Sequence, residues 1–495
     1  MSQFETVIGL EVHAQLKTDS KIFCGCSTQY GAPPNTNICP VCTGQPGVLP
    51  VLNRKAVSFL VTTGLALGCS INPRSLFARK QYFYPDLPKN YQISQYELPL
   101  AECGCVDIVV AGETKRIRVH RIHLEEDAGK LLHAIGARTL DYSLVDLNRT
   151  GVPLMEIVSE PDLRSPEEAV AYLTKLKSIL EYLGVSDCDM EEGKFRCDAN
   201  VSIRPVGQKE LGTKAEIKNM NSFSGVRDAI AYEVERQKNI IASGGKIVQE
   251  TRLWNADTKE SHSMRSKEEA HDYRYFPDPD LVPIELDERY LDSLRKELPE
   301  LPEARCARLV GVLGLSAYDA GVITAEKALA DYYEEALKTA GGEPHGKTTT
   351  PDAAETSAAK MLANWTITEL IGRLNTAGKT IVQSPVVPQH LGRLVFLVRT
   401  GALSGKMGKT VIEEMFISGR PPEEIIKEKG LVQISDETAI GKLCDEALTE
   451  SPKAIEEYKA GKERALGALV GLVMKKSKGQ ANPAAVNKIL KEKLS

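Results

Sequence analysis

Four cysteines near the start of the chain have the types and spacing of metal ligands. Cys24 and Cys26 form one close pair, and twelve residues separate it from a second pair, Cys39 and Cys42. Soft thiolate sulfurs in two such pairs suit a tetrahedral zinc ion, with each pair spanning one edge of the tetrahedron. A closed zinc knuckle of this kind is a scaffold and leaves no open coordination position. The alternative is four unrelated buried thiols, because free cysteine packs as a small hydrophobe.

Alternating polar residues predict a second kind of chemistry. Glu11, His13 and Gln15 alternate with apolar neighbours, so they would share one face of a strand. Two later stretches alternate in the same way: Arg196, Asp198, Asn200 and Ser202, and then Lys214, Glu216 and Lys218, where the pattern stops before Asn219-Met220. Acid, amide and cationic side chains on one side of a sheet would form a cradle for ATP and magnesium, with carboxylates for the metal and cations for phosphate. A polar RNA-binding sheet is the alternative.

Adjacent carboxylates strengthen the magnesium interpretation. Glu125, Glu126 and Asp127 follow one another between cationic residues, and such oxygens suit Mg²⁺, which keeps several waters for a phosphate-bearing ligand. The alternative is a charged turn. Glu156 follows a Gly/Pro turn that also carries Arg149.

Composition limits the class of protein. A chain of 495 residues is too long for one core, so two to four domains are expected. The net charge of −5 restricts any RNA contact to local basic patches. Eleven cysteines, an odd number, fit a reducing compartment better than a disulfide framework. Because neither a signal peptide nor a long apolar segment is visible, we expect a cytoplasmic protein without membrane contact.

The elements that must position these residues change in character near residue 293. Before it, short β-like runs dominate, and they predict an α+β domain around an antiparallel sheet. The predicted strands are Thr6–Leu16, Val106–Val110, Lys115–Leu124, Asn200–Pro205 and Thr213–Asn219. The clearest helix is Ser165–Leu183, which has a serine N-cap and a first-turn proline. A second helix is predicted at Ser224–Ser243.

After residue 294 nearly every segment has helical periodicity. We predict an all-helical domain over 294–408 and a small helical tail domain over 409–495, after a first domain over 1–293 that holds the cradle and the zinc knuckle. From residue 451 onward, ten Lys/Arg stand against four Asp/Glu. This excess is typical of an RNA-facing tail or of a solvated helical face.

One motif should be rejected. Gly341, Gly346, Lys347 and Thr348 match the phosphate-loop pattern, but that loop needs a strand before it and a helix directly after it. The preceding segment is helical and acidic, and a proline follows at Pro351. We predict a flexible loop over Gly341–Ala359 instead, followed by a helix over Ser357–Asn375.

Several of these segments together resemble the B subunit of the tRNA-dependent amidotransferase family (GatB). The resemblance rests on Gly9–His13, Cys39–Gly47, Tyr84–Tyr96, His123–Lys130, Asp146–Ser159, Arg196–Arg204 and Lys475–Pro483, and it covers essentially the whole chain. The segment Thr339–Ala359 departs from it, being longer and more polar.

The resemblance implies an ATP-dependent carbon–nitrogen ligase with glutamine as the amido donor. It implies a heterotrimer in which an amidase-type A subunit releases ammonia and a small C subunit completes the complex. This chain would bind misacylated Glu-tRNA(Gln) or Asp-tRNA(Asn) and phosphorylate the side-chain carboxylate with ATP and Mg²⁺. Ammonia would then displace the phosphate. The chain lacks a recognisable amidase Ser-Lys site, so alone it should not use glutamine.

Site residues follow from the same resemblance. It implies a metal and phosphate end at Glu11, His13, Glu125, Glu126 and Glu156, with Glu11, Glu125 and Glu126 as the residues that bind Mg²⁺ and ATP. It implies further cradle positions at Asp198, Asn200, Glu216 and Lys218. The zinc ligands would be Cys24, Cys26, Cys39 and Cys42, with Cys103 and Cys105 as a rival pair, and the tRNA backbone would be held by Lys475, Lys476 and Lys478.

Two other functions compete with this interpretation. A zinc-containing RNA-binding scaffold without chemistry is the main alternative, but its surface should not place carboxylates where phosphates would lie. A zinc hydrolase is the weaker one, because four cysteines leave no open position on the metal.

Overall fold

The structure is a computed structural model that describes residues 4–136, 138–266, 273–341, 353–431, 437–459, 464–477, 480–481 and 483–494. The chain divides into two compact units, Met1–Leu301 and Pro302–Ser495. The first unit is α+β and the second is helical. Among the helices of these ranges, none combines the length and the apolar character that a membrane span requires. The predicted boundaries at residues 293 and 408 stay predictions.

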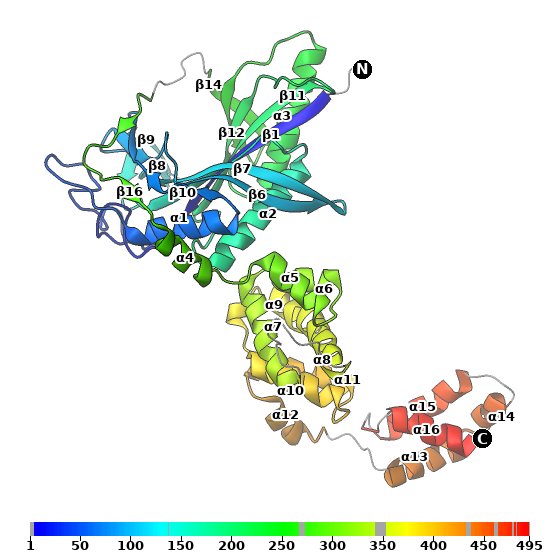
Figure 1. Ribbon diagram of the computed structural model, residues 1–495. Coiled ribbons are helices and arrows are strands. Elements are labelled where there is room, and N and C mark those ends of the chain that lie inside the picture. Colours follow the sequence, from blue (N-terminus) through cyan, green and yellow to red (C-terminus); the bar gives the residue numbers. More distant parts are fainter. Residues whose placement is uncertain are drawn as a thin grey trace. The chain divides into compact units, whose positions relative to one another are not determined.

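A twelve-stranded sheet lies at the centre of the described part of the first unit (Figure 1). Its strand order is β14-β13-β12-β11-β1-β10-β7-β5-β4-β15, and β6 pairs with both β7 and β2. Its strands are β1 (Phe4–Gln15), β2 (Ser70–Ile71), β4 (Ala78–Gln81), β5 (Tyr91–Ser94), β6 (Ala101–Val110), β7 (Glu113–Glu126), β10 (Pro153–Ser159), β11 (Phe195–Pro205), β12 (Ala215–Met220), β13 (Glu250–Asn255), β14 (Glu260–Ser266) and β15 (Phe276–Pro277). Two small sheets pair β3 (Arg74–Ser75) with β16 (Ile284–Glu285), and β8 (Lys130–Ile135) with β9 (Arg138–Asp146).

The expectation of an antiparallel sheet needs one correction among the described strands. β12 and β13 are parallel, because helix α3 (Phe223–Ala242) lies between them and returns the chain to the same end of the sheet. A parallel pair requires such a crossover, whereas a hairpin suffices for an antiparallel pair.

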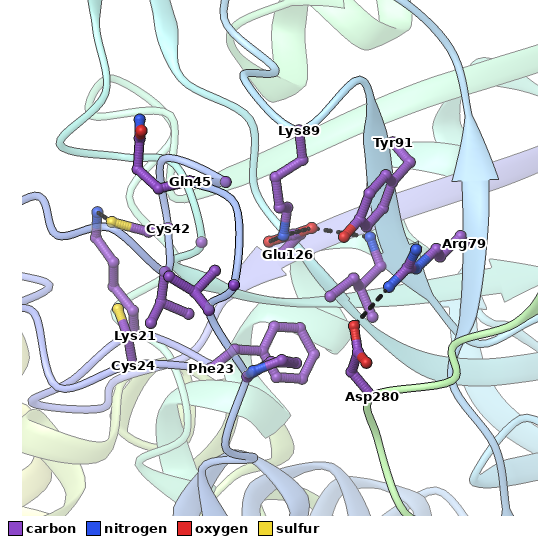
Figure 2. Close-up of a pocket in the computed structure, with 17 residues that line it drawn as sticks. Lys21, Phe23, Cys24, Cys42, Gln45, Arg79, Lys89, Tyr91, Glu126 and Asp280 are labelled. Carbon is purple, nitrogen blue, oxygen red and sulfur yellow. Dashed lines mark hydrogen bonds and ion pairs between the residues drawn. The ribbon is translucent and has the colours of Figure 1, made fainter.

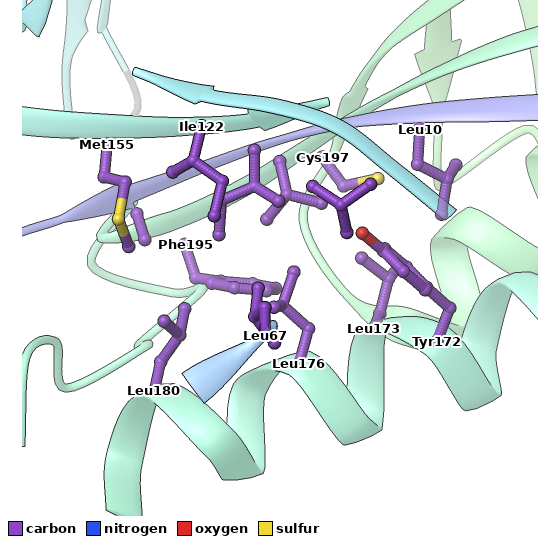
Figure 3. Close-up of a cluster of buried hydrophobic side chains, with 14 of the residues drawn as sticks. Leu10, Leu67, Ile122, Met155, Tyr172, Leu173, Leu176, Leu180, Phe195 and Cys197 are labelled. Atoms are coloured by element: carbon purple, nitrogen blue, oxygen red, sulfur yellow. The ribbon is translucent and has the colours of Figure 1, made fainter. Parts of the chain in front are cut away.

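Helices cover one face of the sheet and leave the other to polar side chains. Figure 3 shows Leu173, Leu176 and Leu180 of helix α2 (Pro166–Leu183) pointing toward Leu10 and Phe195 of the sheet. All five side chains are at most 1% exposed. Because strand side chains alternate, the neighbours of these core residues must lie on the opposite face. That face carries the predicted site.

Helix α1 (Arg54–Ala66) was not predicted, although Asn53 caps it by accepting hydrogen bonds from the backbone N–H groups of Lys55 and Ala56. A glycine and β-branched residues weaken its helical pattern. The glycine has a packing reason, because a Cβ atom at Gly64 would lie 2.7 Å from Ile71 Cδ1. The helix can therefore approach the sheet closely.

Every named element of the second unit is a helix among its described residues. Helix α4 (Glu288–Glu297) is the last helix of the first unit. The α-helices of the second unit are α5 (Pro302–Gly311), α6 (Ala317–Thr324), α7 (Lys327–Ala340), α8 (Ala353–Asn364), α9 (Gly372–Thr376), α10 (Pro388–Arg399), α11 (Gly405–Ser418), α12 (Pro422–Lys429), α13 (Glu437–Glu450), α14 (Pro452–Lys459), α15 (Arg464–Lys476) and α16 (Pro483–Leu494). A π-helical stretch, Trp365–Ile371, joins α8 to α9, and a short 3₁₀ turn spans Ile381–Gln383. Helices α13, α15 and α16 share a small core that includes Ile440, Leu469 and Leu490.

The predicted loop over Gly341–Ala359 is wrong in its last part. Helix α8 starts at Ala353, and Ala358 and Ala359 are fully buried, because alanine-rich sequence favours helix and these small side chains pack. Residues 342–352, which include most of the phosphate-loop match, lie outside the described residues. Gly341 ends helix α7 in the left-handed conformation, with φ +87°, so a helix precedes the match and the strand that a phosphate loop needs is missing there.

Candidate functional site

Strand register brings the predicted polar residues together on the open face of the sheet. Strand β1 lies between β11 and β10, and β7 follows β10. Glu11 is opposite Asp198, and His13 is opposite both Arg196 and Glu156. Glu156 in turn pairs with His123 of β7. Residues distant in sequence therefore meet on neighbouring strands.

His13, Glu125 and Glu156 form the first acidic cluster. His13 Nε2 lies 3.6 Å from Glu156 Oε2 and 3.7 Å from Glu125 Oε1. His123 also belongs here, with its Nε2 atom 3.2 Å from Glu156 Oε2. Both glutamates are buried. The ligand atoms of His13, Glu125 and Glu156 lie within 4.8 Å of one another, so a single cation could contact all three.

The electrostatics of this cluster are strongly perturbed. Burial alone would lower the pKa of His13, but hydrogen bonding to Glu156 and the charges of Glu125, Glu156 and Asp198 overcome it and raise the pKa to about 9. Burial would raise the pKa of Glu156, yet its contacts with His123 and His13 hold that pKa well below the usual value. Two buried carboxylates thus require a positive partner, which His13 supplies when it is protonated.

A second acidic cluster lies beside the first and consists of Glu11, Asp198 and Glu216, whose ligand atoms again fall within 4.8 Å. Lys218 pairs with Asp198 and lies 3.2 Å from Glu216 Oε1. Asn200 donates a 2.9 Å hydrogen bond from Nδ2 to Glu11 Oε1. Burial would lower the pKa of Lys218, but Asp198 and Glu216 raise it. The cluster therefore combines three acids with a cation that stays charged.

Glu126 lies elsewhere, although the sequence groups it with Glu125. Strand β7 continues through Glu126, so consecutive side chains point to opposite faces. The Glu126 carboxylate pairs with Lys89 and accepts a 2.9 Å hydrogen bond from the backbone N–H of Ile93. Both side chains line a cavity of about 240 Å³, whose lining also includes Cys24 and Cys42. Figure 2 shows these lining residues. The structure does not bring Glu126 to either acidic cluster.

The four predicted zinc ligands do converge. Cys24, Cys26, Cys39 and Cys42 place their sulfur atoms within 4.8 Å of one another. Lys21 is 1% exposed, and its Nζ lies 3.6 Å from Cys42 Sγ. A hydrogen bond from Cys24 lowers the pKa of the Cys42 thiol to about 4, with the charge of Lys21 acting in the same direction. The donor set and spacing fit a tetrahedral metal ion. The rival pair, Cys103 and Cys105, lies on β6 and is not part of this group.

Comparison with known proteins decides the family. The model of the GatB/GatE catalytic domain matches residues 6–292, and the model of the GatB domain matches residues 352–494. The chain belongs to the GatB/GatE family. A relative from Carboxydothermus hydrogenoformans is 55% identical over 495 residues and covers 100% of both chains. A relative from Geobacter sulfurreducens is 56% identical over 491 residues and 99% of each chain. Both relatives are named as the B subunit of an aspartyl/glutamyl-tRNA(Asn/Gln) amidotransferase.

In this GatB-family chain, the predicted tRNA-binding lysines differ in their surroundings. Lys475 is exposed at the end of α15. Lys476 pairs with Glu446 at 3.2 Å and with Glu450 at 2.5 Å, both on α13. Lys478 lies outside the described residues. Part of the positive excess in the tail is therefore neutralised by the neighbouring helix.

Sequence reasoning missed some residues of the face. His123 could have been found, because it lies two positions before Glu125 on the same strand face. Lys80 of β4 had no local signal. Burial would lower its pKa, yet the charges of Glu125, Tyr275 and Glu156 raise it, so only the tertiary structure reveals its place near the first acidic cluster.

Proposed function

We propose that this chain acts as the B subunit of a tRNA-dependent amidotransferase. It would activate the side-chain carboxylate of Glu-tRNA(Gln) or Asp-tRNA(Asn) with ATP and transfer ammonia to it, which yields Gln-tRNA(Gln) or Asn-tRNA(Asn). The observation that carries the proposal is similarity over the full length to proteins of that name. The two acidic clusters on one sheet face add chemical support, because they offer oxygen ligands beside a lysine.

The reaction has two balanced steps. A carboxylate oxygen of the aminoacyl group attacks the γ-phosphorus of ATP, the bond to ADP breaks, and an acyl phosphate forms. Ammonia then attacks the acyl carbon, phosphate leaves with the electron pair of the broken C–O bond, and the nitrogen loses a proton. The phosphate is needed because a free carboxylate is a poor acyl electrophile. The protein contributes by positioning and by charge neutralisation.

Named residues would divide this work. His13, Glu125 and Glu156 would hold Mg²⁺ at the first cluster, while Glu11, Asp198 and Glu216 would form a second position for a cation. Magnesium, when bound, neutralises charge on the transferring phosphoryl group. Lys218 pairs with Asp198 in this structure. When a cation binds Asp198 instead, Lys218 would bind a phosphate oxygen. Asn200 would orient the carboxylate of Glu11 through its hydrogen bond. Glu126 would act outside this cradle, since Lys89 already neutralises it.

We propose the remaining assignments on the same basis. Domains would span 1–293, 294–408 and 409–495, and the four cysteines would hold a structural zinc ion. An amidase-type A subunit and a small C subunit would complete the enzyme. The tail domain would hold the tRNA, with Lys475 the favoured backbone contact because it is exposed and has no carboxylate partner among the described ion pairs.

The decisive test is ATP turnover by the chain reconstituted with its A and C partners. ADP formation should require charged tRNA, assayed separately with Glu-tRNA(Gln) and Asp-tRNA(Asn). Glutamine alone should give no ammonia with the isolated chain. Failure of both charged tRNAs to stimulate ATP use would favour the alternative of an RNA-binding scaffold. For the tail domain, Lys475→Ala should weaken tRNA binding several-fold. It should also reduce the slope of the logarithm of the binding constant against the logarithm of salt concentration by about one. Lys476→Ala, which removes a lysine already paired with glutamates, should change both quantities less.

A further inference from the structure

Tyrosine rings line the edge of the polar face beside β7. The aromatic wall consists of Tyr82, Tyr96, Tyr273 and Tyr275, which come from three separate segments. Tyr96 and Tyr275 are stacked with centroids 4.1 Å apart and planes 5° apart. Tyr273 meets Tyr275 edge-on at 6.0 Å and Tyr82 at 6.1 Å. Aromatic pairs prefer these two geometries.

The inner end of the wall lies near the first acidic cluster. The Lys80 ammonium is 4.9 Å from the Tyr273 ring centroid. Burial and the nearby charges of Glu125 and Glu156 raise the pKa of Tyr275 to about 12, although the charge of Lys80 acts in the opposite direction. Ser94 Oγ of β5 lies 3.5 Å from Glu125 Oε2, and Tyr96 follows two residues later, so the wall lies close to this carboxylate.

The outer end of the wall is open to solvent. Tyr96 is 46% exposed, and the Arg121 guanidinium lies 5.9 Å from its ring centroid. Arg121 shares a strand face with His123 and Glu125, because these residues alternate along β7. Its Nε atom is buried and has no hydrogen-bond partner among the described residues.

Backbone conformation supports a special role for the wall. Arg274 has φ +44°, in the left-handed region that residues other than glycine rarely adopt. Residues two positions apart in an extended chain lie on the same side, so Tyr273 and Tyr275 can meet on either side of Arg274. A 2.9 Å backbone hydrogen bond from Gln81 N–H to the Tyr273 carbonyl oxygen holds the segment against β4. Such conformations concentrate at ligand sites.

We propose that Tyr96, backed by Tyr275, binds the adenine ring of a nucleotide whose reacting end lies at the first acidic cluster. This inference rests on the proposed function, which supplies two adenine sources: ATP and the 3′-terminal adenosine of the charged tRNA. Purine bases stack on tyrosine with little need for other contacts. Arg121 would then meet the ribose or phosphate oxygens beside the base.

The test is equilibrium binding to the full chain with three variants. Tyr96→Ala removes the ring, Tyr96→Phe keeps it, and Tyr142→Ala removes a tyrosine that is 57% exposed on β9, outside the site. The ligands are Mg·ATP and Mg·tripolyphosphate, which has the phosphates without the base. Tyr96→Ala should weaken Mg·ATP binding about tenfold and leave tripolyphosphate binding unchanged. Tyr96→Phe should bind Mg·ATP with the affinity of the wild type, and so should Tyr142→Ala.

A second arm distinguishes the source of the adenine. If ATP binding is unchanged but Tyr96→Ala weakens binding of intact tRNA about tenfold, and not of tRNA that lacks its terminal adenosine, the wall binds the tRNA end. The proposal is overturned if neither ligand is affected by more than about twofold, or if tripolyphosphate weakens as much as ATP. A wild-type chain that binds none of ATP, tripolyphosphate and tRNA would overturn the proposed function as well. The two failures are distinguishable, because the first appears in the wild-type chain and the second only in the comparison of wild type with Tyr96→Ala.

Discussion

The cysteine cluster and the acidic face are both groups of candidate metal ligands, but they are assembled in different ways. All four cysteines lie within residues 24–42, in loops and turns. The acidic residues come from strands β1, β7, β10, β11 and β12 and range from Glu11 to Glu216. Ligands that are close in sequence depend on local turns, whereas ligands that are distant depend on strand register. The first kind of site is visible in a sequence, and the second needs the sheet.

The largest expected effect concerns the acidic face. In the reconstituted complex, Glu125→Gln should lower tRNA-stimulated ADP formation by about 100-fold or more, because it removes charge from the phosphoryl-transfer site. Glu113→Gln, on an exposed position of the same strand, is the matched control. Undiminished ATP use by the Glu125 variant would place the metal elsewhere.

The cysteine cluster should respond through metal content before activity. Cys42→Ser should weaken zinc binding by about 100-fold, since total affinities near 10–16 kcal/mol are shared by four ligands. Zinc measured by elemental analysis after gel filtration should fall, while Cys103→Ser should keep it. Loss of zinc in the Cys103 variant alone would favour the rival pair and contradict the assembly described here.

Lys21 offers a smaller test of the same cluster. Its buried ammonium lies against Cys42 and also donates a 3.3 Å hydrogen bond to the Leu147 carbonyl. Removing such an outer partner typically weakens metal affinity 10- to 100-fold, so Lys21→Met should accelerate zinc loss to a chelator about tenfold. Lys17→Met removes an exposed lysine that pairs with Asp187 and serves as control. Equal rates for both variants would deny Lys21 a role at the metal.

The smallest effect is a pH dependence at the acidic face. The pKa of His13 is raised to about 9 in the folded chain, so its protonated form stabilises the fold fully below the unfolded pKa of about 6.5. That stabilisation is lost as pH rises through about 9. In magnesium-free buffer, His13→Gln should therefore destabilise the protein by about 1 kcal/mol more at pH 6 than at pH 10. Urea unfolding at pH 6 and pH 10 measures the free energy of unfolding of wild type and variant, with His133→Gln at an exposed position of β8 as control. The same loss of stability at both pH values would contradict the prediction.

Much of the face could be predicted because alternation is local. The polar residues of β1 and β11 lie where the sequence places them, and helix α2 has the predicted serine cap, with Ser165 accepting a hydrogen bond from the backbone N–H of Glu168. The predicted break after Lys218 is confirmed, since Asn219 has φ +68°. The predicted strand ended at Leu124, however, and this end hid the fact that Glu125 and Glu126 must point apart.

Residue types and short spacings determined the cysteine cluster, the polar strand faces and the resemblance to the GatB family. Each of these depends on chain geometry over a few residues. Only the tertiary structure decided that the acids form two separate clusters, that Glu126 pairs with Lys89, and that tyrosines from three segments meet in the aromatic wall. These contacts join residues far apart in the chain. Which of them meet depends on strand order and register, and these are set by burial of the opposite face.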